Sequence, residues 1–363
     1  LLCIRTYKME QENERIKFTE LSASLKDNDH PFPARLLRGF SDLSAHDLRE
    51  FTLLWQDVAP QRKQSILEDL EELTEKDTLV CFDEMAKAIL NDPEPMVRVL
   101  AVRLLWECED AKIVPGIIDL MLTDPDEGVR STSASLLGRF VYLGELDQIP
   151  EAAKISIVKN LLEVVGSEDL VQVRMRALES LGYSGHSKVP ALLKSAYESR
   201  ETQWVASSLC AMGRSADEQW ADYVLEKLDS GDADILFEAV RAAGELELTG
   251  ALDQLFAIVE EPEYDDEVHL AAIWSLSQIG GSEVKDKLQE LLENSESDEE
   301  VEWIEKALEN LELSGSSDGM NFFDFKPESD GDEEDEDYSE DEDYDSGDYD
   351  SLDDLEDEDD EYE

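Results

Sequence analysis

Residues 172–183, QVRMRALESLGY, decide the fold, because their pattern returns along the chain. Six other segments match it: MVRVLAVRLLWE at 96–107, GVRSTSASLLGR at 128–139, QWVASSLCAMGR at 203–214, DILFEAVRAAGE at 234–245, EVHLAAIWSLSQ at 267–278 and EVEWIEKALENL at 300–311. The second residues of these segments follow one another at intervals of 32, 44, 31, 31, 33 and 33 residues. Such a period is typical of stacked repeat units. The chain is therefore predicted to consist of repeats with one insertion between the second and third copies.

Each copy has the residue spacing of a helix. In 172–183 the apolar residues Val173, Ala177, Leu178 and Leu181 share one helical face. A second, shorter amphipathic stretch lies between successive copies, for example VPALLKSAY at 189–197. We therefore predict an all-α fold, a right-handed α-solenoid of about eight helix pairs over residues 41–313.

The ends of these helices carry their own signals. An acidic turn precedes six of the seven copies, and Asp at an N-cap accepts hydrogen bonds from the first backbone N–H groups of a helix. A glycine follows the apolar face in four copies, where we expect either a left-handed C-cap or a close helix crossing. These glycines are Gly138, Gly182, Gly213 and Gly244.

The strongest motif combines an Asp-Pro turn, a Val-Arg pair and a later Leu and Gly. It occurs as DPEPMVR at 92–98, as DPDEGVR at 124–130 and, without the turn, as VRMRALESLG at 173–182. Over about residues 76–311 the chain resembles HEAT repeats of the short bacterial kind that are often named after phycobilin lyases. The resemblance implies an armadillo-like helical protein, and it implies that Arg98, Arg130 and Arg174 bridge to the preceding Asp turn.

The net charge excludes several partners. The 363 residues contain 31 Lys and Arg against 91 Asp and Glu, a formal charge of −60. A protein that binds nucleic acid or an anionic membrane directly must neutralise phosphates with basic side chains, so we expect neither as a partner. We expect a protein partner, with a basic protein as one candidate, and a monomeric chain.

Part of this charge lies in a C-terminal tail. Residues 314–363 contain 26 acidic residues and one basic residue, Lys326, which gives −25. Such a segment lacks the apolar residues needed for a core, so we predict a disordered polyacidic tail that increases solubility or captures basic proteins. We predict a partly disordered N-terminal arm at 1–40 and the solenoid at 41–313. Met9 is the expected true start of the chain.

The sequence offers little for catalysis. The four cysteines and four histidines have no metal-ligand spacing, so we expect no metal, no cofactor and no catalytic residue. HEAT-repeat hydroxylases of the deoxyhypusine type bind iron through His-Glu dipeptides, and no His here precedes Glu. We expect buried, reduced thiols and a soluble, cytoplasmic chain. The cysteines are Cys3, Cys81, Cys108 and Cys210.

These observations favour a non-enzymatic scaffold that binds a protein partner on the concave solenoid surface. The alternative is a bilin lyase-like or other HEAT-repeat modifying enzyme, or a subunit of one. Trp55, Trp106, Trp204 and Trp220 are expected in the core. The candidate partner-binding residues are of three kinds. Arg103, Arg176, Arg241 and Trp274 are predicted to point outward from the second helices, and Arg139 and Arg214 are predicted to lie just past the ends of these helices. Phe322, Phe323 and Phe325 form an aromatic cluster after the last helix.

Overall fold

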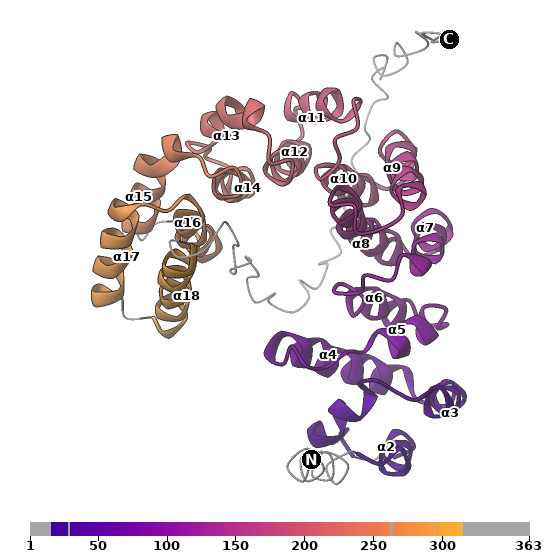
Figure 1. Ribbon diagram of the computed structural model, residues 1–363. Coiled ribbons are helices and arrows are strands. Elements are labelled where there is room, and N and C mark those ends of the chain that lie inside the picture. The colour runs from indigo at the N-terminus through magenta and orange to yellow at the C-terminus, as the bar shows by residue number, and fades with distance from the viewer. Residues whose placement is uncertain (1–15, 28–29, 262–263, 296, 315–363) are drawn as a thin grey trace, which may run out of the picture. The chain divides into compact units, whose positions relative to one another are not determined.

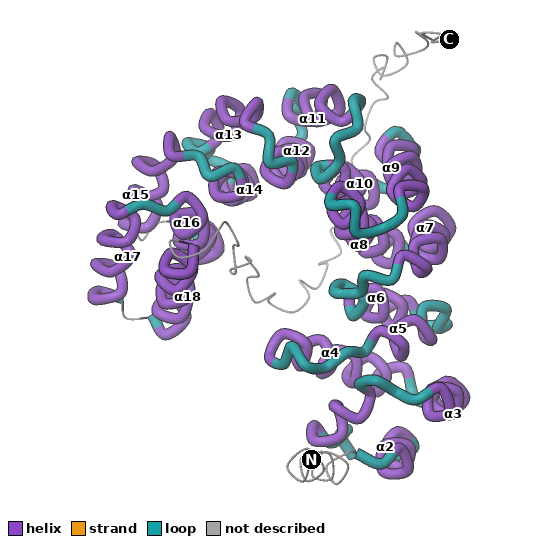
Figure 2. Tube along the Cα trace, in the orientation of Figure 1, coloured by secondary structure: helices purple, strands orange, loops and turns teal. Residues whose placement is uncertain are grey.

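The computed structural model describes residues 16–27, 30–261, 264–295 and 297–314 (Figure 1). These residues form helices and loops, and no strand occurs among them (Figure 2). The chain divides into two units, 1–325 and 326–363, and the second unit lies outside the described residues. The all-α prediction is therefore confirmed, whereas the predicted tail lies almost wholly outside the described residues.

The N-terminal region begins the packing earlier than predicted. Helix α2 (Phe18–Leu25) and the 3-10 helix η1 (Ala34–Phe40) precede the first pair, α3 (Ala45–Trp55) and α4 (Pro60–Lys76). Leu21 and Phe40 are buried, and the ring of Phe40 contacts that of Phe51 on α3. The described residues before position 41 therefore belong to the same core as the repeats rather than to a separate arm.

Eight helix pairs follow one another in the described chain, as predicted. The first helices of the pairs form what we call the A helices, and the second helices form the B-helix row. After α3 and α4 the pairs are α5 (Asp83–Ile89) and α6 (Pro95–Arg103), α7 (Val114–Thr123) and α8 (Glu127–Glu145), α9 (Glu151–Val165) and α10 (Val171–Leu181), α11 (Val189–Tyr197) and α12 (Thr202–Arg214), α13 (Ala221–Lys227) and α14 (Ala233–Glu245), α15 (Leu252–Glu260) and α16 (Asp266–Ile279), and α17 (Ser282–Asn294) and α18 (Asp298–Ser314).

The B-helix row is the continuous layer of the fold. Each B helix from α4 to α16 packs against the next B helix, and each B helix from α6 to α18 packs against its own A helix (Figure 1). Three-residue 3-10 helices lead into three A helices: η2 (Ala111–Ile113), η3 (Glu218–Trp220) and η4 (Thr249–Ala251). The repeat anchors, such as Val173 and Val268, are buried in the single core that runs between the two layers.

The regular spacing of glycines serves close packing of the B helices. Gly182 has right-handed helical dihedrals, and a Cβ atom there would lie 2.7 Å from the Cα of Ala211 on α12. A Cβ at Gly244 would lie 2.7 Å from the Cα of Ser275 on α16. Of the two predicted roles, the close helix crossing is correct at these positions. The left-handed C-cap is wrong, since Gly280 and Gly281 are the positive-φ glycines of the described residues.

Asp residues cap the B helices as predicted. The side chain of Asp126 accepts a hydrogen bond from the N–H of Val129 at 3.1 Å, and Asp232 accepts one from Ile235 at 3.2 Å. Asp265 accepts one from the N–H of Glu267 at 3.1 Å. Much of the acidity of the folded unit therefore serves helix termini.

The repeat arginines bridge in the opposite direction from the prediction. Arg98 donates to the carbonyl of Asp92 in its own turn, but the carboxylate it binds belongs to Asp124 of the following repeat. Arg130 likewise binds Asp169 of the following repeat at 3.0 and 2.7 Å. The reason is geometric: one edge of the guanidinium is taken by the carbonyl of its own turn, and the other edge faces the next turn.

Arg174 has different partners, because the next repeat has no Asp in the corresponding turn. Its guanidinium donates to the carbonyl of Val165 at 3.0 Å and lies over the ring of Trp204, 5.3 Å from the centroid. A cation–π contact therefore replaces the ion pair at this repeat boundary.

Candidate functional site

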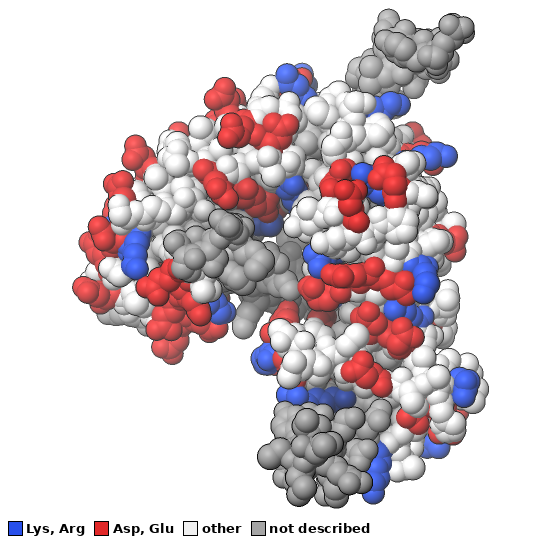
Figure 3. Space-filling view, in the orientation of Figure 1, with Lys and Arg blue, Asp and Glu red and all other residues white. Residues whose placement is uncertain are grey.

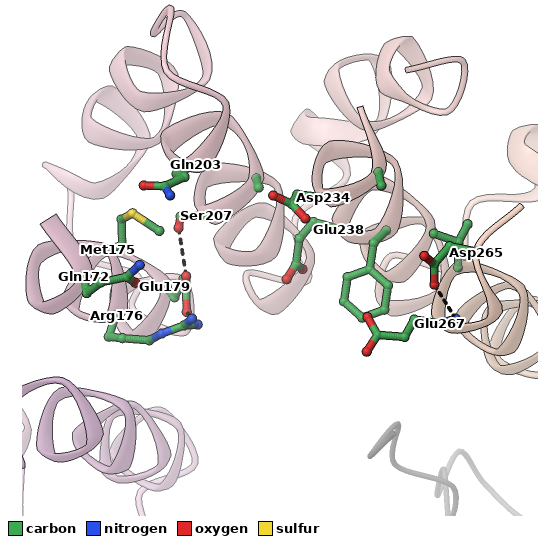
Figure 4. A pocket seen from close by; sticks show the side chains of 14 residues that line it. Gln172, Met175, Arg176, Glu179, Gln203, Ser207, Asp234, Glu238, Asp265 and Glu267 are labelled. Carbon is green, nitrogen blue, oxygen red and sulfur yellow. Dashed lines mark hydrogen bonds and ion pairs between the residues drawn. The ribbon is translucent and has the colours of Figure 1, made fainter. Parts of the chain in front are cut away.

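A cavity of about 370 Å³ opens on the B-helix row between α10 and α16 (Figure 4). It is shared by four consecutive B helices and lies near their N-terminal ends. The lining residues are Gln172, Met175, Arg176 and Glu179 on α10, Gln203, Ala206 and Ser207 on α12, Ala233, Asp234, Phe237 and Glu238 on α14, and Asp265, Glu267 and Val268 at the start of α16.

The lining repeats the register of the sequence motif. Gln172, Gln203, Asp234 and Glu267 each stand directly before the repeat anchor, at the start of successive B helices. In three of the repeats, the residue three positions later also lines the cavity, as Met175, Ala206 and Phe237. The residue four positions later does so as well, as Arg176, Ser207 and Glu238. The cavity is therefore built by one helical face that recurs in neighbouring repeats.

The two ends of the cavity differ in charge. At the α10 end, Arg176 donates to Glu179 at 2.7 Å, and Ser207 donates to the other carboxylate oxygen of Glu179 at 2.8 Å (Figure 4). These contacts neutralise that end. The α14 and α16 end carries four carboxylates and no basic lining residue: Asp234, Glu238, Asp265 and Glu267.

A half-buried ionic cluster on α14 lies beside the cavity. Arg241 lies 3.5 Å from Glu238 and 3.1 Å from Glu245, all on α14. Burial raises the pKa of Glu238, although the guanidinium of Arg241 opposes this effect. Burial also opposes the charge on Arg241, but Glu238 and Glu245 outweigh it and raise the pKa of this guanidinium. Paired in this way, the cluster holds the carboxylate of Glu238 in place at the cavity.

The described thiols are not poised for nucleophilic chemistry. Burial raises the pKa of Cys108 to about 11 and the pKa of Cys210 well above its usual value. Partial burial raises the pKa of Cys81 as well. Cys81 is exposed, so the prediction that it is buried is wrong, because it lies in the loop before α5. All three thiols are therefore protonated at neutral pH.

The histidines make local polar contacts. His269 lies 2.8 Å from Glu300 of the next repeat, and His30 and His46 lie close to Asp27 and Asp47 at the surface. Among the described residues, no group of three or more His, Cys, Asp or Glu side chains is placed to hold a metal ion.

The predicted binding arginines are engaged in ion pairs or ring contacts. Arg103 binds Glu71 on α4 at 2.7 Å, and Arg139 lies 3.4 Å from Glu107. Arg139 is inside α8 rather than past its end, because α8 extends to Glu145.

Of the predicted arginines, Arg176 alone lines the cavity. Arg214, the last residue of α12, lies over the ring of Tyr183 at 5.4 Å from the centroid. Arg241 belongs to the ionic cluster of α14 described above.

The aromatic predictions have mixed outcomes. Trp274 is 5% exposed, so its predicted outward position is wrong. The equivalent positions of α12 and α14 hold Cys210, which is buried, and Arg241, which belongs to an ionic cluster. Trp55 and Trp220 are buried as predicted, whereas Trp106 and Trp204 are partly buried against the core. Phe322, Phe323 and Phe325 lie outside the described residues.

Sequence reasoning missed the acidic and amide residues of the cavity. These residues can be found by aligning the repeat segments. The position directly before the anchor, which is the second residue of each segment, changes along the chain from Gln to Asp and Glu. The sequence pattern explains the acidic residues of the turns as helix caps alone. Asp265 does cap α16, but it also lines the cavity.

A second cavity, of about 640 Å³, lies beside the insertion in the repeat pattern. It is lined by one face of α9 and by the turn after α10, including Ser184, Gly185 and His186. Ile155 on α9 is 59% exposed at this place, and Lys154 is paired with both Glu145 and Glu151.

On the face of the molecule shown in Figure 3, Asp and Glu side chains are more widespread than Lys and Arg side chains, in agreement with the composition. None of the described helices has the length and apolarity needed to cross a membrane.

Comparison with known proteins agrees with the fold. The HEAT-repeat family model matches residues 82–155 and 221–309. No curated protein matches the sequence.

Solved structures with similar folds are distant. The CpcE–CpcF complex of phycocyanin lyase from Nostoc sp. PCC7120 is 17% identical, with 79% of this chain and 97% of that chain covered and a TM-score of 0.48. The YibA protein of E. coli is 14% identical, with 78% and 99% covered and a TM-score of 0.40. Human deoxyhypusine hydroxylase is 16% identical, with 84% and 99% covered and a TM-score of 0.34. At these values none carries information about the activity or ligand of this chain.

The motif, the eight helix pairs and the family match lead to the same result. The Asp-Pro turns join the A and B helices of two pairs, and the matched residues cover six of the eight pairs in whole or in part. The chain is a HEAT-repeat protein.

Proposed function

We propose that this chain is a non-enzymatic scaffold that binds a protein partner on the B-helix row, at the cavity between α10 and α16. One observation carries the proposal: four consecutive B helices contribute equivalent positions to one hollow. A surface that repeats along stacked helices fits a ligand that is itself extended. A segment of another protein has this property.

The dimensions support a chain segment rather than a small molecule. Neighbouring packed helices lie about 8–10 Å apart, so the three steps from α10 to α16 span roughly 24–30 Å. An extended peptide advances about 3.3 Å per residue, so about seven to nine residues cross this surface.

The chemistry of the described residues supports a binding role over catalysis. The carboxylate of Glu179 is engaged by Arg176 and Ser207, and Glu238 is held by Arg241. A general acid or base must exchange protons with a substrate, and groups committed to structural pairs are poorly suited to that task. The protonated thiols are likewise poor nucleophiles.

The tail and the cellular context complete the proposal. We propose that residues 314–363 keep chains apart by repulsion or attract basic proteins, and that the protein acts as a monomer in the cytoplasm. A charge of −25 over this segment favours both the repulsion between chains and the attraction of basic proteins. These electrostatic forces act over long distances only in low salt, because salt screens them.

A photo-crosslinking amino acid at Gln203 tests the binding surface in cells. Gln203 is exposed in the cavity, and Gln289 is an exposed glutamine on the A helix α17 that serves as the matched control. We expect a discrete protein adduct from position 203 and none from position 289. Adducts at neither position, or the same adducts at both, would contradict the proposal.

A further inference from the structure

We propose that the cavity binds an extended peptide segment that carries two basic residues at one end and uncharged residues at the other. This inference rests on the proposed function and adds the chemistry of the partner. Its basis is charge complementarity: the lining has five carboxylates and one guanidinium, and four of the carboxylates lie at the α14 and α16 end.

The acidic end can bind cations without giving up structural contacts. In the described part of the chain, no Lys or Arg pairs with Asp234, Asp265 or Glu267, and all three residues are exposed. Asp265 uses its Oδ1 atom to cap α16, which leaves Oδ2 available to a ligand. Guanidinium and ammonium groups form charge-assisted hydrogen bonds with such carboxylates.

Two glutamines line the neutral end. Gln172 and Gln203 are exposed, and within the described residues neither amide makes a hydrogen bond. They stand at equivalent positions of adjacent repeats. A glutamine amide offers both a donor and an acceptor, as a peptide main chain does, so the two side chains can bind the backbone of an extended segment.

The apolar part of the lining suits long basic side chains. Met175, Phe237 and Val268 lie among the polar groups of the cavity. The aliphatic stems of Arg and Lys pack well on such surfaces while their charged ends reach carboxylates. An acidic segment, including the tail of this chain, would be repelled from the same place.

The test measures the affinity of a defined peptide for the full chain. The probe is a fluorescent nine-residue peptide with Arg at positions 7 and 9 and uncharged polar residues elsewhere, and the comparison peptide has Glu in place of both Arg. Measurements in about 0.3 M salt limit the contribution of the tail, since the screening length there is about 6 Å.

The variants are matched in charge and position. Asp234→Asn with Glu267→Gln removes two carboxylates from the cavity. Asp253→Asn with Glu283→Gln removes two exposed carboxylates from the first turns of A helices α15 and α17. We expect the cavity variant to bind the Arg peptide about five- to tenfold more weakly and the control variant to bind it as the wild type does.

Each other outcome overturns the inference. Equal losses in both variants would assign binding to the general charge of the chain. Equal binding of the Glu peptide, or no binding of the Arg peptide, would show that the cavity does not select basic segments. The crosslinking experiment at Gln203 is independent of these results, so the scaffold role can stand when the basic partner is rejected.

Discussion

Arg98 binds Asp124 across a repeat boundary, with Nε donating to Oδ2 at 2.8 Å and the terminal Nη2 donating to Oδ1 at 2.7 Å. Both side chains are buried. Burial works against ionisation of Asp124, but the hydrogen bonds from Arg98 and from the N–H of Asp126, together with the charge of Arg98, outweigh it and lower the pKa of the carboxyl. The pair therefore joins one repeat to the next with a charged contact that is shielded from solvent.

Loss of this arginine is expected to destabilise the protein strongly. Arg98→Ala leaves the carboxylate of Asp124 buried without its partner, which costs about 3–5 kcal/mol in the free energy of unfolding. Arg103→Ala is the control, because Arg103 is 45% exposed in its pair with Glu71 and its loss costs less than about 1 kcal/mol. Urea unfolding followed by circular dichroism measures both. Equal losses would mean that the Arg98 pair has no special role.

The same pair predicts a pH dependence. The pKa of Asp124 in the folded chain lies below its usual value of 3.8. Its contribution to stability is therefore complete above pH 3.8 and is lost as the pH falls through the folded-state pKa. The stability advantage of the wild type over Asp124→Asn should be constant down to about pH 5 and shrink below pH 3.8. Urea titrations at each pH measure it, and an advantage that grows in acid would contradict the assignment.

Two glycine substitutions should have opposite signs. A Cβ at Gly244 would lie 2.7 Å from the backbone of Ser275, so Gly244→Ala should destabilise by about 1–3 kcal/mol through overpacking. A Cβ at Gly116 on α7 would meet no atom of a neighbouring residue within 4 Å, so Gly116→Ala should stabilise by up to about 1 kcal/mol. Thermal unfolding of the two variants measures the difference. A stabilising Gly244→Ala would show that the B helices are not closely packed there.

The thiols should differ in accessibility. Cys108 and Cys210 are buried with raised pKa values, whereas Cys81 is exposed. Alkylation of the native chain at pH 7, followed by peptide mass spectrometry, should modify Cys81 first and the two buried thiols only after denaturation. Rapid modification of Cys210 in the native chain would contradict the packing of α12 between its neighbours.

The repeat pattern predicted the fold because it reports burial. Val173 and Val268 recur at one position since each must reach the core, and Gly182 recurs since a neighbouring helix passes close by. What the sequence could not give is the relation between neighbouring repeats. The direction of the Arg98 contact depends on how the next turn is placed, and the spacing of one repeat is compatible with either direction.

The candidate site shows the same limit. Position 274 is outward-facing when one helix is considered alone, but Trp274 is buried in the stacked repeats. Gln203, Asp234 and Glu267 look like unrelated surface residues along the chain, and stacking brings them to one cavity. A binding site of a solenoid is formed by equivalent positions of neighbouring repeats, so comparing these positions between repeats identifies its residues.

The central claim is that a basic protein segment binds the B-helix row at this cavity. The most direct measurement is to attach a photoreactive group to the nine-residue Arg peptide, irradiate its complex with the full chain, and map the adducts by mass spectrometry. The account predicts adducts on the lining residues of α10, α12, α14 and α16. Adducts confined to residues 314–363 or to the A helices would contradict it.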